Sequence, residues 1–130
     1  MQISVPHAPF GWAEELHYSQ AVVAGELVFS SGQGGFGPDG ELVEGGFEPQ
    51  LRQAFANLRA ALTGAGASLE SIVKLTVFLA DSEDYSTWRR VRSEILTPPW
   101  PAATAIGSAL LVRGMEVELE AVAVRGTTRA

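Results

Sequence analysis

The segment from Pro49 to Gly64 constrains the fold most, because its apolar residues recur at steps of four, three and four. These residues are Leu51, Phe55, Leu58 and Leu62. That spacing is the period of one face of an α-helix. Pro49 suits the first turn of a helix, and Gly64 and Gly66 suit its exit. The pattern predicts one long amphipathic helix near the middle of the chain.

Strand-like segments flank this helix on both sides. Gln20–Val23 and Leu27–Ser30 are short apolar runs separated by a turn at Gly25, which predicts a hairpin. After the helix, Ser71–Ala80 is apolar on both of its alternating sides. Such a strand is expected at the centre of a sheet, with both faces covered.

A second helix and two further strands complete the predicted order. Asp81–Asp84 offers a cap and first-turn acids, and the helix that follows is stopped by Thr97–Pro101. Its expected apolar face carries Tyr85, Trp88, Val91 and Ile95. Thr104–Val112 and Met115–Val124 are the last strands, with a turn at Val112–Met115.

The order β-β-α-β-α-β-β indicates a single α+β domain over residues 1–130, with a mixed sheet and both helices on one face. A sheet covered on one side has a second face to hide. In a chain that is 46% hydrophobic, we expect another subunit to cover it, and a closed ring is the natural solution.

Composition excludes several kinds of site. The chain has no cysteine, so thiol nucleophiles and thiolate metal sites are ruled out, and with only His7 and His17 we expect no metal and no cofactor. Its net charge of −6, without a basic stripe, makes nucleic acid an unfavourable partner. No leader or membrane span is evident, so a cytoplasmic protein is expected.

The run Gly32–Gly37 matches G-x-G-x-x-G after a strand, which is the pattern of a dinucleotide-binding loop. Such a loop must lead directly into a helix whose N-terminus meets the pyrophosphate. Here Pro38–Gly40 makes a turn instead. A flexible loop with positive-φ positions is therefore the preferred interpretation.

Three carboxylates alternate along the last strand, at Glu116, Glu118 and Glu120. Side chains two apart point the same way, about 7 Å from one another. One reading is a solvated face paired with Lys74 or Arg113. The other is that one glutamate lines a cleft between subunits and handles a proton or a water, with its pKa raised by burial beside like charges.

Four segments, in order and in register, resemble the RidA/YjgF family of reactive-intermediate deaminases. They span nearly the whole chain: Tyr18–Val22, Val28–Gln33, Ile72–Leu79 and Val117–Val124. The resemblance implies a chorismate-mutase-like fold assembled as a homotrimer, with small-molecule clefts between subunits. It also implies hydrolysis of 2-imino acids and their enamine tautomers to 2-keto acids and ammonia, without metal or cofactor.

Position by position, the resemblance assigns roles to several residues. Tyr18 matches the cleft tyrosine of the family, and Ser31 with Gly32 matches its cleft serine and glycine. Glu118 matches the glutamate that works with the attacking water and the leaving ammonia.

Two positions depart from the family pattern. Deaminating members carry an arginine that clamps the substrate carboxylate, where this chain has Ala103, and Arg89 replaces a helix asparagine near the cleft. One possibility is that Arg89, or Arg113 of a neighbouring subunit, replaces the missing cation. The other is that the ligand has no carboxylate and packs against an aromatic wall formed by Trp100 and Phe36. A non-catalytic small-molecule-binding trimer is the alternative function, and ribonuclease activity is a third.

Overall fold

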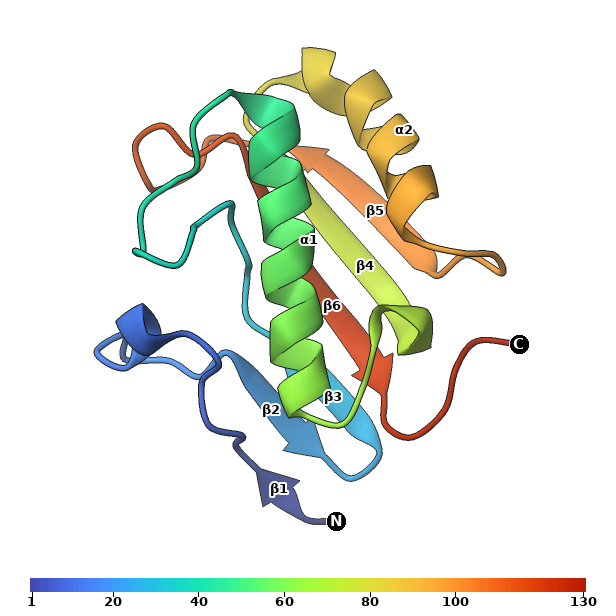
Figure 1. Cartoon of the computed structure of the whole chain (residues 1–130). Coiled ribbons are helices and arrows are strands. Elements are labelled where there is room, and N and C mark those ends of the chain that lie inside the picture. Colours follow the sequence, from blue (N-terminus) through green and yellow to red (C-terminus); the bar gives the residue numbers. More distant parts are fainter.

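The structure is a computed structural model that describes Met1–Ala130. Its central helix α1 spans Phe47–Gly64 and covers one face of the sheet (Figure 1). The four apolar residues that predicted this helix are all at most 1% exposed. The predicted exit is also confirmed, since Gly66 adopts φ +84° and the Ala67 N–H donates to the Leu62 carbonyl. The helix therefore buries the face that its period marks.

The sheet has six strands in the order β1-β2-β3-β6-β4-β5. Their bounds are β1 Ile3–Ser4, β2 Ala21–Ala24, β3 Leu27–Ser30, β4 Ile72–Leu79, β5 Ala102–Gly107 and β6 Val117–Val124. The predicted hairpin at Gly25 joins β2 to β3, and the glycine has φ +62° there. β1 pairs with β2 and was not predicted, because two residues are too short to show a period.

The last two strands differ from the prediction. β5 ends at Gly107 instead of reaching Val112, and it runs parallel to β4 rather than beside β6. β6 pairs antiparallel with β4 on the other side, so β4 lies between them. The expected turn at Val112–Met115 does form, with the Met115 N–H donating to the Val112 carbonyl, but it belongs to a longer loop.

Helix α2 spans Tyr85–Ile95 and connects β4 to β5. The predicted cap belongs to the 3-10 turn Ser82–Asp84 ahead of the helix, where the Asp81 carboxylate accepts from the Glu83 N–H. Asp84, the N-cap residue of α2 itself, makes no side-chain capping hydrogen bond, and the first turn of α2 carries no acid. Three short 3-10 turns, Gly11–Ala13, Leu69–Ser71 and Ser82–Asp84, complete the chain. No helix combines the length and apolar character that a membrane span requires.

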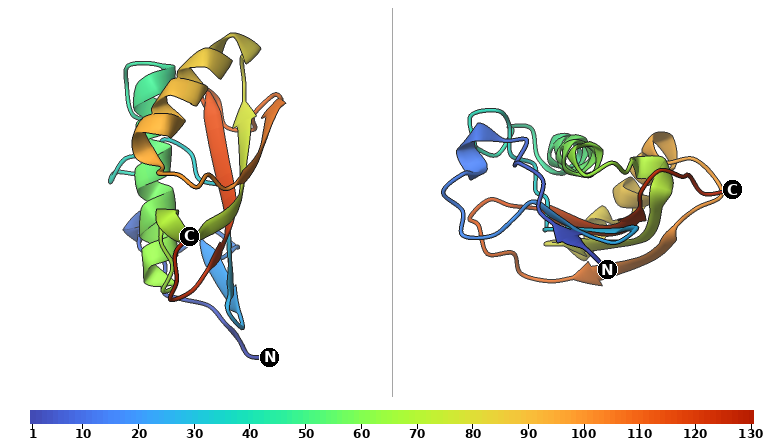
Figure 2. Two further views of the ribbon diagram at one scale, coloured as in Figure 1. Left: turned by 90° about the vertical axis from the view of Figure 1, so that its right-hand side faces the viewer. Right: turned by 90° about the horizontal axis from the view of Figure 1, so that it is seen from below.

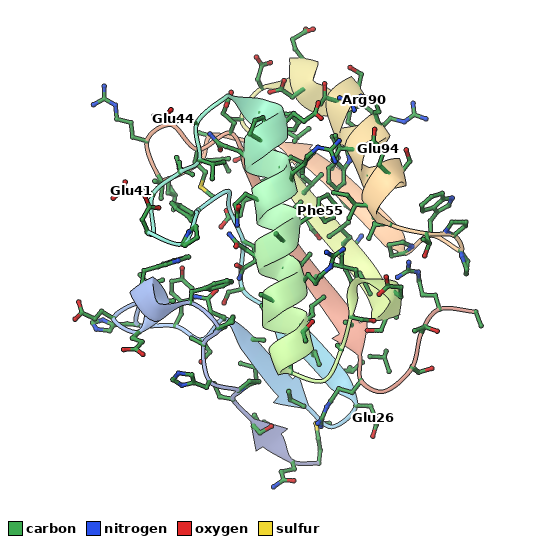
Figure 3. The ribbon with its side chains drawn as sticks, in the orientation of Figure 1. Glu26, Glu41, Glu44, Phe55, Arg90 and Glu94 are labelled. Atoms are coloured by element: carbon green, nitrogen blue, oxygen red, sulfur yellow. The ribbon has the colours of Figure 1, made fainter.

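Both helices lie on the same side of the sheet, as predicted (Figure 2). Between them, Phe55 of α1 stacks on Trp88 of α2 with ring centroids 5.8 Å apart. Outside this contact, Glu48 and Arg52 of α1 form a four-membered ring of ion pairs with Arg90 and Glu94 of α2. Figure 3 shows Arg90 and Glu94 on α2 and Phe55 on α1.

The other face of the sheet is open in the single chain. The prediction that β4 is covered on both faces is therefore not met here, since Thr76 and Phe78 are only half-buried while Leu75 and Val77 are fully buried. Leu27 and Phe29 of β3 are 40% and 44% exposed on this open face. An α+β chain with two helices has no further element to cover it.

Candidate functional site

Glu118 lies near the start of β6 on the open face of the sheet. Its neighbours Val117 and Leu119 point into the core and are fully buried, so the strand alternation directs Glu118 away from the helices. Phe78 of β4 is its cross-strand partner. Burial raises the pKa of the Glu118 carboxyl above its usual value, and the nearby charge of Glu120 raises it further.

Gly32 lies directly against this carboxyl. Gln33 forms an isolated antiparallel bridge with Leu119, in which each backbone N–H donates to the other carbonyl. A β-carbon on Gly32 would lie 2.3 Å from Glu118 Oε1. The absence of a side chain at position 32 therefore allows the carboxyl to occupy this place.

The glycine-rich segment is packed rather than flexible. Gly35 approaches α1 so closely that a β-carbon would lie 2.6 Å from the Gln50 Cα atom. Within Gly32–Gly40 only Gly40 has a positive φ. A turn follows the segment, in which the Gly40 N–H donates to the Gly37 carbonyl, and no helix begins there. The predicted turn at Pro38–Gly40 is confirmed, but the expected flexible loop with several positive-φ positions is wrong, because the segment is closely packed.

A hollow of about 510 Å³ opens beside Glu118. Its mixed lining includes Trp12, Tyr18, Gly32, Phe36, Leu111 and Glu118. Most of the wall is apolar or aromatic, and one carboxyl with raised pKa faces into it. This combination is typical of a small-molecule site that carries out acid–base chemistry.

Two glutamine side chains form a buried pair at this hollow. Gln33 Nε2 donates to Gln20 Oε1 over 2.8 Å. Both residues line the hollow and are at most 5% exposed, yet Gln20 Nε2 has no hydrogen-bond partner. An unpaired buried donor is costly, so this amide is a polar group of the site whose hydrogen bond is not satisfied within the chain. Neither glutamine was predicted from the sequence as a residue of the site.

Ser31 lies beside the hollow but does not line it. Its hydroxyl donates to the Ser19 carbonyl, which ties the end of β3 to the segment that carries Tyr18. The predicted residues Tyr18, Gly32 and Glu118 are thus brought together, while Ser31 holds the backbone next to them.

Two polar residues on the buried face of α1 hold the surrounding loops, and neither was predicted from the sequence. Asn57 Nδ2 donates to the carbonyls of Gly34 and Phe36, over 2.9 and 2.8 Å. Gln50 Nε2 donates to the Gly114 carbonyl, and its Oε1 accepts from the Glu116 N–H. Their spacing of seven residues on an otherwise apolar face was the signal that could have found them.

The three alternating glutamates do not share one environment. Gln50 Nε2 also reaches Glu116 Oε2, at 3.5 Å, so this carboxyl turns toward α1. Glu120 is exposed. No ion pair joins any of the three to Lys74 or Arg113, and Lys74 Nζ instead donates to Thr104 Oγ1 over 2.6 Å. Only Glu118 combines burial with a place in the hollow.

Arg89 and Ala103 lie elsewhere in the same chain. Together with Trp100 they line a second hollow, of about 640 Å³, between α2 and β5. Phe36, the other aromatic residue considered for a ligand wall, lines the Glu118 hollow instead. A single chain therefore divides the predicted binding residues between two separate hollows. No group of three His, Cys, Asp or Glu side chains is placed to hold a metal ion.

Comparison with known proteins gives a consistent assignment. Residues 11–125 match the family model described as Endoribonuclease L-PSP. The 2-iminobutanoate/2-iminopropanoate deaminase of Bos taurus is 41% identical over 110 residues, which cover 84% of this chain and 80% of the bovine protein. The Homo sapiens deaminase of the same name is 38% identical over equal shares.

A solved structure supports the same assignment. The crystal structure of RidA from the Antarctic bacterium Psychrobacter sp. PAMC 21119 matches with a TM-score of 0.86 at 38% identity. The match covers 93% of this chain and 98% of that one. The chain belongs to the Endoribonuclease L-PSP family, the family of RidA.

Proposed function

We propose that this protein hydrolyses reactive 2-imino acids, such as 2-iminobutanoate, to the 2-keto acid and ammonia. The observation that carries the proposal is Glu118, a carboxyl with raised pKa that lies against Gly32 in a largely apolar hollow. The identity of 41% to the bovine deaminase supports the same reaction class.

The chemistry needs one group that can both accept and return a proton. In the first step, Glu118 takes a proton from water as the water oxygen bonds to the imine carbon. Glu118 then gives that proton to the imine nitrogen as the C=N π bond opens, which yields a carbinolamine and returns Glu118 to its ionised form. In the second step, Glu118 takes the proton of the carbinolamine hydroxyl and delivers it to the nitrogen. The carbonyl forms, the C–N bond breaks, and the nitrogen leaves as ammonia. A carboxyl with raised pKa suits both directions of transfer near neutral pH.

The walls of the hollow have separate roles in this proposal. Tyr18 and the unpaired Gln20 amide donate hydrogen bonds that orient the substrate, while Ser31 and Gly32 fix the backbone around the carboxyl. Phe36 and Trp12 limit the access of bulk water, which strengthens the polar contacts inside.

The proposal includes assembly into a homotrimer with its ligand sites between subunits. The open sheet face, with Leu27 and Phe29 exposed, supports a second copy packed against it. In such a ring, the α2–β5 hollow of one subunit, with Arg89 and Ala103, adjoins the Glu118 hollow of the next. The two hollows would then form one cleft.

A second candidate is a non-catalytic trimer that binds a small molecule. It is favoured by Ala103, whose methyl group offers neither charge nor hydrogen-bond donor to a ligand in the α2–β5 hollow. The variant Ala103→Arg discriminates, because imine hydrolysis that appears only in the variant would mean that the wild type binds without turnover. The net charge of −6 argues against RNA as the substrate.

The direct experiment generates 2-iminobutanoate in situ and measures ammonia release with and without the protein. The proposal expects the protein to accelerate release in proportion to its concentration. Equal rates with and without protein would reject it.

A further inference from the structure

The segment that follows β6 turns back toward the start of β4 (Figure 1). Gly126 has φ +70° in this turn, and its N–H donates to the Gly66 carbonyl. Three residues later, the Arg129 N–H donates to the Glu70 carbonyl over 2.9 Å. Both acceptors lie in the connection between α1 and β4. These backbone hydrogen bonds therefore place the Arg129 side chain beside the start of β4.

The Arg129 guanidinium donates to four backbone carbonyls in two separate segments. Nη1 donates to the carbonyls of Leu69 and Ile72, over 2.9 and 3.0 Å, at the 3-10 turn and the first residue of β4. Nε donates to the Pro99 carbonyl over 2.6 Å, and Nη2 donates to the Thr97 carbonyl over 3.0 Å. A guanidinium has five N–H donors, so only one of them is left over. One side chain therefore joins the start of β4 to the loop that precedes β5.

This loop, Thr97–Pro101, needs donors from elsewhere in the chain. Three of its five residues are prolines, which have no backbone N–H. The ladder between β4 and β5 begins only beyond the loop, where Lys74 pairs with Ala102. Arg129 supplies the N–H groups that the ladder does not provide here, and so it ties the loop to the edge of the sheet.

The same loop forms one wall of the hollow between α2 and β5. Trp100 and Pro101 line that hollow, and Trp100 is 53% exposed in the single chain. A large side chain on a loose loop would have several orientations, and a ligand would have to order it at a cost in affinity. Arg129 lines neither this hollow nor the Glu118 hollow. Its effect on a ligand must therefore pass through the loop.

We propose that Arg129 is a positioning residue of the ligand site, which holds the Thr97–Pro101 loop against β4 and so presents Trp100 as a preformed wall. The inference rests on the proposed function, in which the α2–β5 hollow is one part of the ligand cleft. Arg129 uses donors on three nitrogens of a planar group, whereas a lysine has a single nitrogen. Arg129→Lys therefore keeps the charge but cannot join the two segments in the same way.

The first measurement observes the loop directly. The chain has three tryptophans, so fluorine NMR of the full chain labelled with 5-fluorotryptophan gives three resonances, and Trp100→Phe assigns one of them. We expect Arg129→Lys to shift the Trp100 resonance and to leave those of Trp12 and Trp88 unchanged. The matched control is Arg125→Lys, which changes an exposed arginine just after β6 that forms no ion pair. It should leave all three resonances unchanged.

The second measurement is the affinity for 2-oxobutanoate, the keto acid formed from 2-iminobutanoate, by calorimetry. We expect Arg129→Lys to weaken binding about two- to tenfold, the factor that corresponds to ordering one large side chain on binding. Arg125→Lys should bind 2-oxobutanoate as wild type does. Addition of 2-oxobutanoate to the labelled wild-type protein should also shift the Trp100 resonance.

The outcomes separate this inference from the proposed function. A Trp100 resonance or an affinity that stays unchanged in Arg129→Lys would overturn the inference. Shifts of all three tryptophans would also overturn it, since Arg129 would then support the whole fold, and so would a wild-type Trp100 resonance that does not respond to 2-oxobutanoate. If these measurements come out as expected but the protein releases no ammonia from 2-iminobutanoate, the hydrolase is rejected and the role of Arg129 is supported.

Discussion

Glu118 Oε1 occupies the space that a side chain on Gly32 would need, since a β-carbon there would lie 2.3 Å from that oxygen. The two residues come from different parts of the chain and meet because Gln33 pairs with Leu119. The position of the acid in its hollow therefore depends on a glycine at position 32.

The variant Gly32→Ala should displace the Glu118 carboxyl. We expect kcat/KM for 2-iminobutanoate to fall about tenfold to hundredfold, because a shift of about 1 Å in a catalytic group has this effect. The free energy of unfolding should fall by about 1 to 3 kcal/mol, the usual cost of overpacking. Kinetics and urea denaturation measure the two effects.

Gly64→Ala is the matched control. Gly64 lies at the end of α1 with nothing within 4 Å of an added β-carbon. This change should leave activity unchanged and raise stability by up to about 0.5 to 1 kcal/mol. If the two variants behave alike, the contact between Gly32 and Glu118 has no functional role.

The variant Glu120→Gln should shift the acidic limb of the plot of kcat/KM against pH. Glu118 must be ionised to accept a proton from water, so kcat/KM falls as the pH falls through its pKa. That pKa is raised by burial and by the charge of Glu120. Removal of the Glu120 charge lowers it, so the limb should shift to lower pH. Glu70→Gln, an exposed change outside the hollow, should leave the limb in place. A limb that does not move, or moves upward, would contradict the assignment to Glu118.

Glu118 should also affect stability in a pH-dependent way. Its pKa in the folded state is raised, so the stability it contributes is fully present below the unfolded pKa and is lost as the pH rises through the folded pKa. Glu118→Gln removes this dependence. We therefore expect the variant to gain stability relative to wild type as the pH rises above about 4, the ordinary pKa of a glutamate. Urea denaturation at several pH values measures the difference. If the difference in the free energy of unfolding between wild type and Glu118→Gln does not change with pH, then the pKa of Glu118 is not raised by folding.

The proposed homotrimer, in which a second copy covers the open sheet face, should be detectable in solution. Light scattering coupled to gel filtration should give three times the chain mass of 13.8 kDa. Phe29→Asp, at a position 44% exposed on that face, should shift the mass toward a single chain, because a buried charge without a partner is costly. The control variant Arg59→Asp changes an exposed residue of α1 and should leave the measured mass unchanged. A wild-type protein that elutes as one chain would remove the proposed cleft between subunits.

Local patterns in the sequence were sufficient for the helices, the hairpin and the orientation of Glu118. The period of Leu51, Phe55 and Leu58 and the alternation of Val117, Glu118 and Leu119 each reflect which face is buried. Which face of a helix or strand is buried can be predicted from the sequence, because it depends on the spacing of apolar residues within that one element.

Contacts between distant segments could not be predicted in the same way. The parallel pairing of β4 with β5 depends on the α2 crossover, whereas the turn at Val112–Met115 suggested that β5 and β6 were neighbours. Likewise, Asn57 supports the loop carbonyls of Gly34 and Phe36 from the middle of α1. Its place on the apolar face indicated a buried amide, but not what it binds.

The most direct test of the account compares Glu118 of β6 with Glu116, which lies just before that strand. Glu118 faces the hollow, while Glu116, two residues earlier, turns toward Gln50 of α1. Ammonia release from 2-iminobutanoate generated in situ should fall at least about a hundredfold in Glu118→Gln, the usual contribution of a general acid–base group. It should stay near the wild-type rate in Glu116→Gln. Wild-type rates in Glu118→Gln would contradict the account.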